Sequence, residues 1–131
     1  MSASSKVIIT FVLMFTCINV FTQTSIVEPS QDPKATFRLF RTANTWNFLE
    51  LNTITGQLWQ VQFDIENDNR GTEVLSLSNL AKGKAQIPGR FTLFPTLNIY
   101  TFILLDQIDG ITWQVQWSFE EKNRFVLLIS E

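Results

Sequence analysis

Strict alternation of apolar and polar residues predicts two β-strands, each with one apolar face. In residues 57–64 the side chains of Trp59, Val61 and Phe63 fall on one side of the segment and two glutamines fall on the other. Residues 111–119 repeat this alternation with two tryptophans and a valine. A period of two is that of a strand with one face in the core and the other towards water or a ligand.

Six further segments are rich in apolar, aromatic or β-branched residues and are bounded by turn residues, which is typical of short strands. The eight predicted strands are Phe37–Thr42, Thr45–Asn52, Gln57–Asp64, Glu73–Ser78, Phe91–Thr96, Ile99–Asp106, Ile111–Phe119 and Arg124–Ser130. Segment Ile99–Asp106 is apolar on both sides, which indicates an inner strand covered on both faces. We expect Gly56 and Gly110 to close hairpins with a positive φ.

The strand pattern consists of two copies of one unit. Residues 37–70 align with residues 91–124 at a spacing of 54 positions without a gap, and 16 of the 34 pairs are identical. Two further pairs are close substitutes, Trp46 with Tyr100 and Phe63 with Trp117. Such a repeat is typical of a small supersecondary unit built twice, in which neither copy can bury its own apolar face.

These elements predict an all-β domain at residues 37–131, with repeat 1 at 37–78, a linker at 79–90 and repeat 2 at 91–130. We expect two tandem four-stranded antiparallel meanders that form a pseudo-twofold barrel or sandwich, because one chain then buries both apolar faces. The alternative is two propeller-like blades that need partner chains, since two blades cannot close a ring. The segments L-N-T-I-T-G-Q-L-W and L-D-Q-I-D-G-I-T-W resemble the blade turn of quinoprotein-type propellers.

The N-terminal residues have the pattern of an export signal. Lys6 precedes the apolar run Val7–Phe21, and Val20-Phe21-Thr22 offers a cleavage site, which predicts a signal peptide at residues 1–22. The product is then periplasmic or extracellular, begins with a flexible leader at 23–36 and has no membrane span. An uncleaved anchor and a lipid anchor through Cys17 are the alternatives.

Composition excludes several function classes. The chain has no histidine and its single cysteine is Cys17, so histidine-dependent catalysis, thiol nucleophiles and the usual zinc sites are excluded from the mature domain. Cleavage after Thr22 removes one of ten basic residues and leaves twelve acidic ones, a net charge of −3. With its basic residues scattered, such a domain is not expected to bind nucleic acid. We expect no enzymatic activity, no cofactor and no metal.

One acidic segment is open to two other interpretations. Asp64, Glu66 and Asp68 alternate with other residues, as carboxylates do in a calcium loop. The sixth position of such a loop is Asn69 rather than glycine, and the twelfth is Leu75 rather than glutamate, so a polar hairpin loop is favoured. A hydrolase that uses two carboxylates is the other interpretation.

Polar residues that both copies share are the candidate binding residues. An amide has both a donor and an acceptor, so glutamines on an open sheet face could bind sugar hydroxyls or a peptide backbone. They could equally form cross-strand hydrogen bonds, and Asn44 and Asn98 could cap turns, while Arg70 and Arg124 could pair with Glu66 and Glu120. The candidates are Asn44, Gln60, Gln62, Arg70, Asn98, Gln114, Gln116 and Arg124.

The segment G-R-F-T-L-F-P-T-L-N-I-Y-T-F-I-L-L-D-Q-I-D-G-I-T-W-Q-V-Q-W-S, Gly89–Ser118, resembles a family of small secreted tandem-repeat proteins of gut Bacteroidales. The resemblance covers residues 37 to 130 and implies an exported bacterial β-repeat domain, without an activity or functional residues. We therefore expect an exported, non-enzymatic binding module for a carbohydrate or protein ligand. The alternative is a periplasmic inhibitor or immunity-type protein that sequesters an enzyme or a toxin. The oligomeric state does not follow from the sequence.

Overall fold

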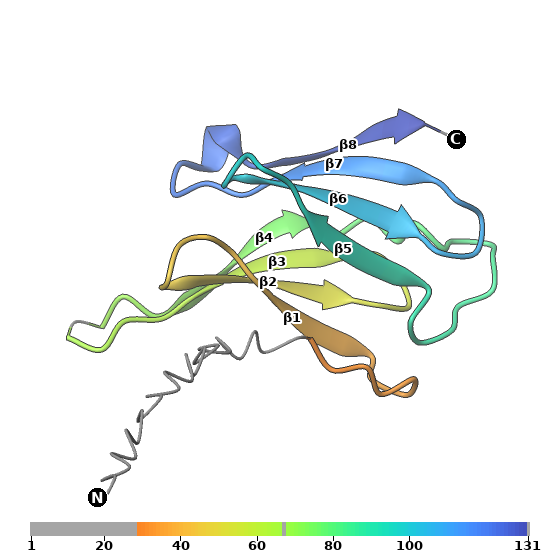
Figure 1. Ribbon diagram of the computed structural model, residues 1–131, viewed down its shortest axis with the longest axis horizontal. Helices are drawn as coiled ribbons and strands as arrows, with labels where there is room; N and C mark the ends of the chain where they lie inside the picture. The colour runs from red at the N-terminus through yellow and green to blue at the C-terminus, as the bar shows by residue number, and fades with distance from the viewer. Residues whose placement is uncertain (1–28, 67, 131) are drawn as a thin grey trace, which may run out of the picture.

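The computed structural model describes residues 29–66 and 68–130. The predicted signal peptide and Cys17 lie outside the described residues. The described chain is all-β, as predicted, and forms two four-stranded antiparallel sheets that lie one above the other (Figure 1). No helix in the described residues is long and apolar enough to cross a membrane.

Each repeat forms one sheet, and each sheet is a simple meander in which neighbours in sequence are neighbours in space. Sheet 1 contains β1 (Phe37–Arg41), β2 (Asn47–Asn52), β3 (Leu58–Gln62) and β4 (Gly71–Ser76). Sheet 2 contains β5 (Phe91–Pro95), β6 (Thr101–Asp106), β7 (Thr112–Gln116) and β8 (Phe125–Ser130), with a 3₁₀ turn η1 (Glu121–Asn123) before β8. All eight predicted strands are present, so the prediction of two tandem meanders is confirmed.

The glycines of the β2–β3 and β6–β7 turns have the predicted conformation. The φ angle is +78° at Gly56 and +76° at Gly110, a region that L side chains rarely adopt. In both turns the preceding Asn52 or Asp106 accepts hydrogen bonds from two backbone N–H groups through its side-chain oxygen. These paired features fix the register of the two central hairpins.

Cross-strand register assigns the residues of β1–β3 and β5–β7 to one of two faces in each sheet. The front face of sheet 1 carries Phe37, Leu39, Phe48, Trp59 and Val61, and that of sheet 2 carries their repeat equivalents Phe91, Leu93, Phe102, Trp113 and Val115. The back face of sheet 1 carries Phe40, Leu49, Leu51, Leu58 and Gln60, and that of sheet 2 carries Phe94, Ile103, Leu105, Thr112 and Gln114.

The core lies between unlike faces of the two sheets. The buried side chains of sheet 1 belong to its back face, and those of sheet 2 belong to its front face. Phe91 is fully buried, whereas its equivalent Phe37 is 52% exposed, and Trp113 is buried while Trp59 is only half-buried. The described residues therefore form a sandwich of two sheets and not a closed barrel. The back face of sheet 1 packs on the front face of sheet 2, so the two repeats are not related by a twofold axis that brings like faces together.

This stacking corrects the predicted environment of two groups of residues. Alternation predicts the aromatic side of β3 in the core. In the structure the opposite side of β3, with Leu58 and Gln60, is buried, and Trp59 and Val61 on the aromatic side are only half-buried. The expected covering of both faces of β6 is also wrong for the part of the chain that the structure describes, because Ile103 and Leu105 on its back face are only half-buried. Alternation identifies the two sides of a strand, but it cannot say which side the next sheet covers.

The linker between the sheets is held by a buried ion pair. Arg90 donates to both carboxylate oxygens of Asp106, with the shortest N–O distance 2.7 Å, and both side chains are almost completely buried. Arg90 also contacts Asp109 at 2.8 Å and the carbonyl of Ala85 at 2.8 Å. The backbone of Phe91 donates to the carbonyl of Thr53, which joins the start of sheet 2 to the β2–β3 turn of sheet 1.

Candidate functional site

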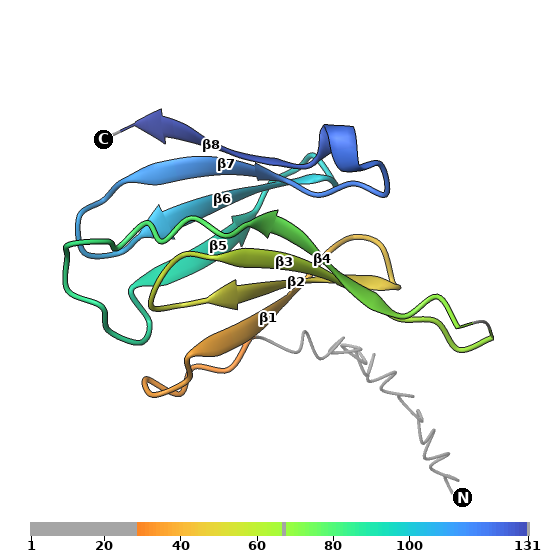
Figure 2. The same ribbon diagram turned by 180° about the vertical axis from the view of Figure 1, so that it is seen from behind.

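Four hairpin loops gather at one end of the molecule, which we call the loop end. They join β1 to β2, β3 to β4, β5 to β6 and β7 to β8, and they lie together on the left in Figure 1. Figure 2 shows the same grouping from behind. The loops of the two repeats are thus brought side by side, and each repeat has a pocket there.

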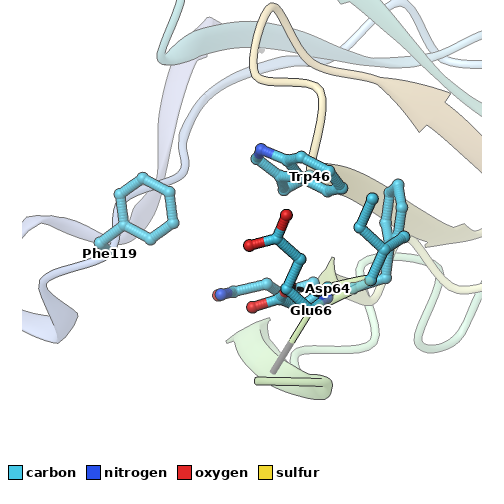
Figure 3. Close-up of a pocket in the computed structure, with 7 residues that line it drawn as sticks. Trp46, Asp64, Glu66 and Phe119 are labelled. Carbon is cyan, nitrogen blue, oxygen red and sulfur yellow. Dashed lines mark hydrogen bonds between the residues drawn. The ribbon is translucent and has the colours of Figure 1, made fainter. Parts of the chain in front are cut away.

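The first pocket belongs mainly to repeat 1 and has a volume of about 380 Å³. It is lined by Trp46, Gln62, Phe63, Asp64, Ile65, Glu66 and Phe119. Figure 3 shows the Glu66 carboxylate below the Trp46 ring, with Phe119 approaching from sheet 2 on the opposite side. The pocket therefore combines aromatic walls with an amide and two carboxylates.

The second pocket has a volume of about 320 Å³ and is built from the equivalent residues of repeat 2. It is lined by Tyr100, Gln116, Trp117, Ser118, Phe119, Glu120 and Asn123. Six of these seven residues stand 54 positions after a lining residue of the first pocket. The sequence repeat is therefore also a repeat of a pocket, with an aromatic pair, a glutamine and a glutamate in both copies.

An aromatic pair forms one wall of each pocket. The ring centroids of Trp46 and Phe63 are 5.3 Å apart, and those of Tyr100 and Trp117 are 5.1 Å apart. Trp46 and Tyr100 are 40% and 44% exposed, so part of each side chain is accessible from solvent. The indole N–H of Trp117 donates to the carbonyl of Ile99 at 3.0 Å, which fixes the orientation of that ring.

Two of the predicted binding residues position these aromatic side chains. Asn44 Oδ1 accepts a hydrogen bond from the backbone N–H of Trp46 at 2.8 Å, and Asn98 Oδ1 accepts one from the N–H of Tyr100 at 2.9 Å. The alternative role of these asparagines, capping a turn, is confirmed. The caps fix the backbone that carries each exposed ring, so they support the pockets without lining them.

Hydrogen-bonding groups stand beside each aromatic pair. Gln62 and Gln116 line the two pockets, and Gln116 Nε2 donates to the carbonyl of Asn123 at 2.9 Å. The side chains of Glu66 and Glu120 are exposed, and Glu120 contacts Lys122 at 3.2 Å. These amides and carboxylates supply donors and acceptors around an apolar wall, as ligand pockets commonly do.

The remaining predicted binding residues lie away from the pockets. Gln60 is buried between the sheets, donates to Asn47 Oδ1 at 3.1 Å and has an Oε1 without a partner in the described residues. Gln114 lies half-buried on the open back face of sheet 2. The predicted row of glutamines on one open face is therefore not formed, because stacking covers the face that carries Gln60.

The two arginines also have other roles than the predicted ones. Arg70 pairs with Asp68 at 2.7 Å on the surface, not with Glu66. Arg124 donates to the carbonyl of Ser118 at 2.7 Å and reaches Glu73 of sheet 1 at 3.2 Å, so it links the two sheets. Asp64 is the equivalent of Ser118 in repeat 1. The β3–β4 loop is closed by a hydrogen bond from the Asn69 side chain to the Asp64 carboxylate, whereas the β7–β8 loop is closed by the bond from Arg124 to the carbonyl of Ser118.

Sequence reasoning missed the aromatic members of the site. The signal was present, because Trp46 and Tyr100, like Phe63 and Trp117, are conserved in character between the repeats without being identical. The described residues contain no group of three or more carboxylate, histidine or cysteine side chains that could hold a metal ion. Comparison with protein-family models, curated proteins and solved structures gives no match to this chain.

Proposed function

We propose that the protein is an exported carbohydrate-binding module with one sugar site in each repeat. The observation that carries this proposal is the pair of equivalent pockets at the loop end, each with a partly exposed aromatic ring beside an amide and a carboxylate. A pyranose ring has an apolar face of C–H groups and an edge of hydroxyls. Such a ring matches a site with an aromatic wall and surrounding donors and acceptors.

The differences between the pockets favour binding over hydrolysis. Asp64 and Glu66 form a carboxylate pair in the first pocket, but the second has Ser118 in the place of Asp64. A hydrolase that needs two carboxylates would therefore work in one repeat only. The aromatic pair, the glutamine and the glutamate are the features that both pockets keep, and these are binding groups.

A glycan array followed by an NMR titration tests the proposal. We expect binding of a saccharide with a Kd on the order of 1 mM or tighter, which corresponds to about −4 kcal/mol or more. Trp46→Ala should weaken binding at the first pocket only, and Tyr100→Ala at the second only. The affinity of the altered site should fall at least about tenfold, or by about 1.4 kcal/mol. Both side chains are partly exposed, so neither change should unfold the domain.

Ile108→Ala is the matched control. Ile108 is 51% exposed, like the two aromatic residues, but it lies in the β6–β7 turn at the opposite end of the molecule. Its replacement should leave both sugar affinities unchanged. An array without any saccharide signal, together with a tight protein partner in a pull-down, would favour the inhibitor or immunity function instead.

A further inference from the structure

Each chain presents two open sheet faces that are copies of the faces buried inside it. Among the described residues nothing covers the front face of sheet 1, whereas its equivalent on sheet 2 is covered by sheet 1. Phe37 and Leu39 are 52% and 50% exposed, whereas their equivalents Phe91 and Leu93 are 0% and 4% exposed. The aromatic contact is also repeated, because the rings of Phe37 and Trp59 are 6.2 Å apart and those of Phe91 and Trp113 are 6.1 Å apart.

The back face of sheet 2 has the same relation to the back face of sheet 1. Leu49 and Leu51 are completely buried, while the equivalent Ile103 and Leu105 are only half-buried. Phe94 is 51% exposed, whereas its equivalent Phe40 is 7% exposed. Contiguous apolar surface of this kind is uncommon on a monomer and marks an interaction site.

We propose that a second copy of this chain docks the front face of its sheet 1 onto the back face of sheet 2, and that repetition of this joint closes a ring. Inside each chain the back face of sheet 1 already packs on the front face of sheet 2, so the joint between copies pairs the same two kinds of face. An interface between unlike faces is heterologous, so it leads to a ring or a filament rather than to a twofold dimer. Rings of four-stranded meanders close with roughly four to eight sheets, or about two to four copies of this chain.

The pocket geometry supports the same partner. The wall of the first pocket that comes from the neighbouring sheet is Phe119, the equivalent of Ile65 in repeat 1. The second pocket has no wall from a neighbouring sheet within residues 29–66 and 68–130. Docking of a second copy places the partner's Ile65, which is 76% exposed, at the corresponding position and completes the second pocket.

The joint between copies differs from the internal joint at several front-face positions, and the charged Glu50 is one of them. Glu50 pairs across the strands with Trp59, where sheet 2 has Leu104 opposite Trp113. Leu104 is completely buried. Burial of a carboxylate is unfavourable compared with burial of leucine. Assembly is therefore expected to be reversible on dilution, while the internal joint stays closed.

Native mass spectrometry and light scattering of the full-length chain test this proposal. The wild-type chain should give a discrete mass of two to four copies. Leu39→Glu on the front face and Leu127→Glu on the back face of sheet 2 should each give single chains, because a charge then faces the apolar partner surface. Leu127 pairs across the strands with Gln114, which places it on the back face, and it is 57% exposed. Both positions therefore tolerate a polar residue in the isolated fold.

Mixing the two variants identifies the geometry of the joint. Leu39→Glu keeps an intact back face and Leu127→Glu keeps an intact front face, so the mixture should form a one-to-one pair that cannot grow further. Leu97→Glu is the control, because Leu97 is fully exposed in the β5–β6 loop and should not affect assembly. A single-chain mass for the wild type, or Leu127→Glu pairing with itself, would overturn the proposal. These masses are independent of sugar binding.

Discussion

At the scale of single residues, repeat 1 contains the same turn as repeat 2 but without the buried ion pair, so the two turns can be compared. Asn52 in repeat 1 and Asp106 in repeat 2 accept hydrogen bonds from backbone N–H groups two and three positions ahead, at 3.0 and 3.2 Å in both turns. Only Asp106 also binds an arginine, Arg90. Replacement of Asp106 by asparagine therefore keeps the turn and removes the ion pair alone.

We predict that Asp106→Asn lowers the free energy of unfolding by about 3 kcal/mol, the lower end for breaking a buried pair, because Asp109 still neutralises Arg90 in part. A urea titration followed by tryptophan fluorescence measures the change. The control is Asp68→Asn, which removes the surface pair with Arg70 and should have no measurable effect. Equal effects of the two substitutions would contradict the structural role of Arg90.

The same residue gives a pH dependence. Burial raises the pKa of the Asp106 carboxyl, but the hydrogen bonds from Arg90 and from the backbone of Ile108 and Asp109 together outweigh burial and lower that pKa. A carboxyl whose pKa falls on folding stabilises the protein above the unfolded-state value of about 3.9 and loses this contribution at lower pH. The unfolding free energy of the wild type should therefore fall more steeply below about pH 4 than that of Asp106→Asn.

At the scale of elements, the two central hairpins differ in what surrounds their glycines. A Cβ at Gly56 would lie 2.9 Å from Cδ1 of Leu80 and 3.2 Å from its Cγ, whereas a Cβ at Gly110 would meet nothing within 4 Å. Both positions have a positive φ, so alanine is strained by about 1–2 kcal/mol in either turn. Gly56→Ala has to displace Leu80 as well.

We therefore expect Gly110→Ala to destabilise the protein by about 1–2 kcal/mol and Gly56→Ala by about 1 kcal/mol more. Urea midpoints of the two variants, with similar slopes, measure this order. A cost at Gly110 equal to or greater than that at Gly56 would mean that Leu80 moves freely and does not pack against the turn.

Most element positions could be predicted because they depend on local chemistry. Alternation located β3 and β7, and turn residues separated the strands. The boundaries differ where hydrogen bonding decides them. The strand predicted from Glu73 begins at Gly71, because Gly71 pairs with Gln62 although neither residue gives an apolar signal. The strand predicted from Thr45 begins at Asn47, because the Asn44 side chain closes a turn over the first residues.

At the scale of the whole molecule, the direction of stacking could not be predicted from the strand pattern. Both faces of β6 are apolar, and the tryptophans of both repeats are alike, so the pattern is compatible with covering either face. The choice depends on the linker, where the buried Arg90 and the hydrogen bond from Gly89 to Thr53 set the start of sheet 2 beside the β2–β3 turn. The candidate site depends on the same choice, because stacking brings Phe119 to the first pocket.

Assembly through the open faces makes a spectroscopic prediction at this scale. Trp59 is half-buried in one chain, but in the ring it takes the environment of its buried equivalent Trp113. Trp46 should change little, because its equivalent Tyr100 stays 44% exposed next to the internal joint, and Trp113 and Trp117 are buried in either state.

Leu127→Glu separates the copies without altering a tryptophan, so its emission should shift to longer wavelength and acrylamide should quench it more strongly than in the wild type. Leu97→Glu should keep the wild-type spectrum, and identical spectra for wild type and Leu127→Glu would show that Trp59 is not covered by a second chain.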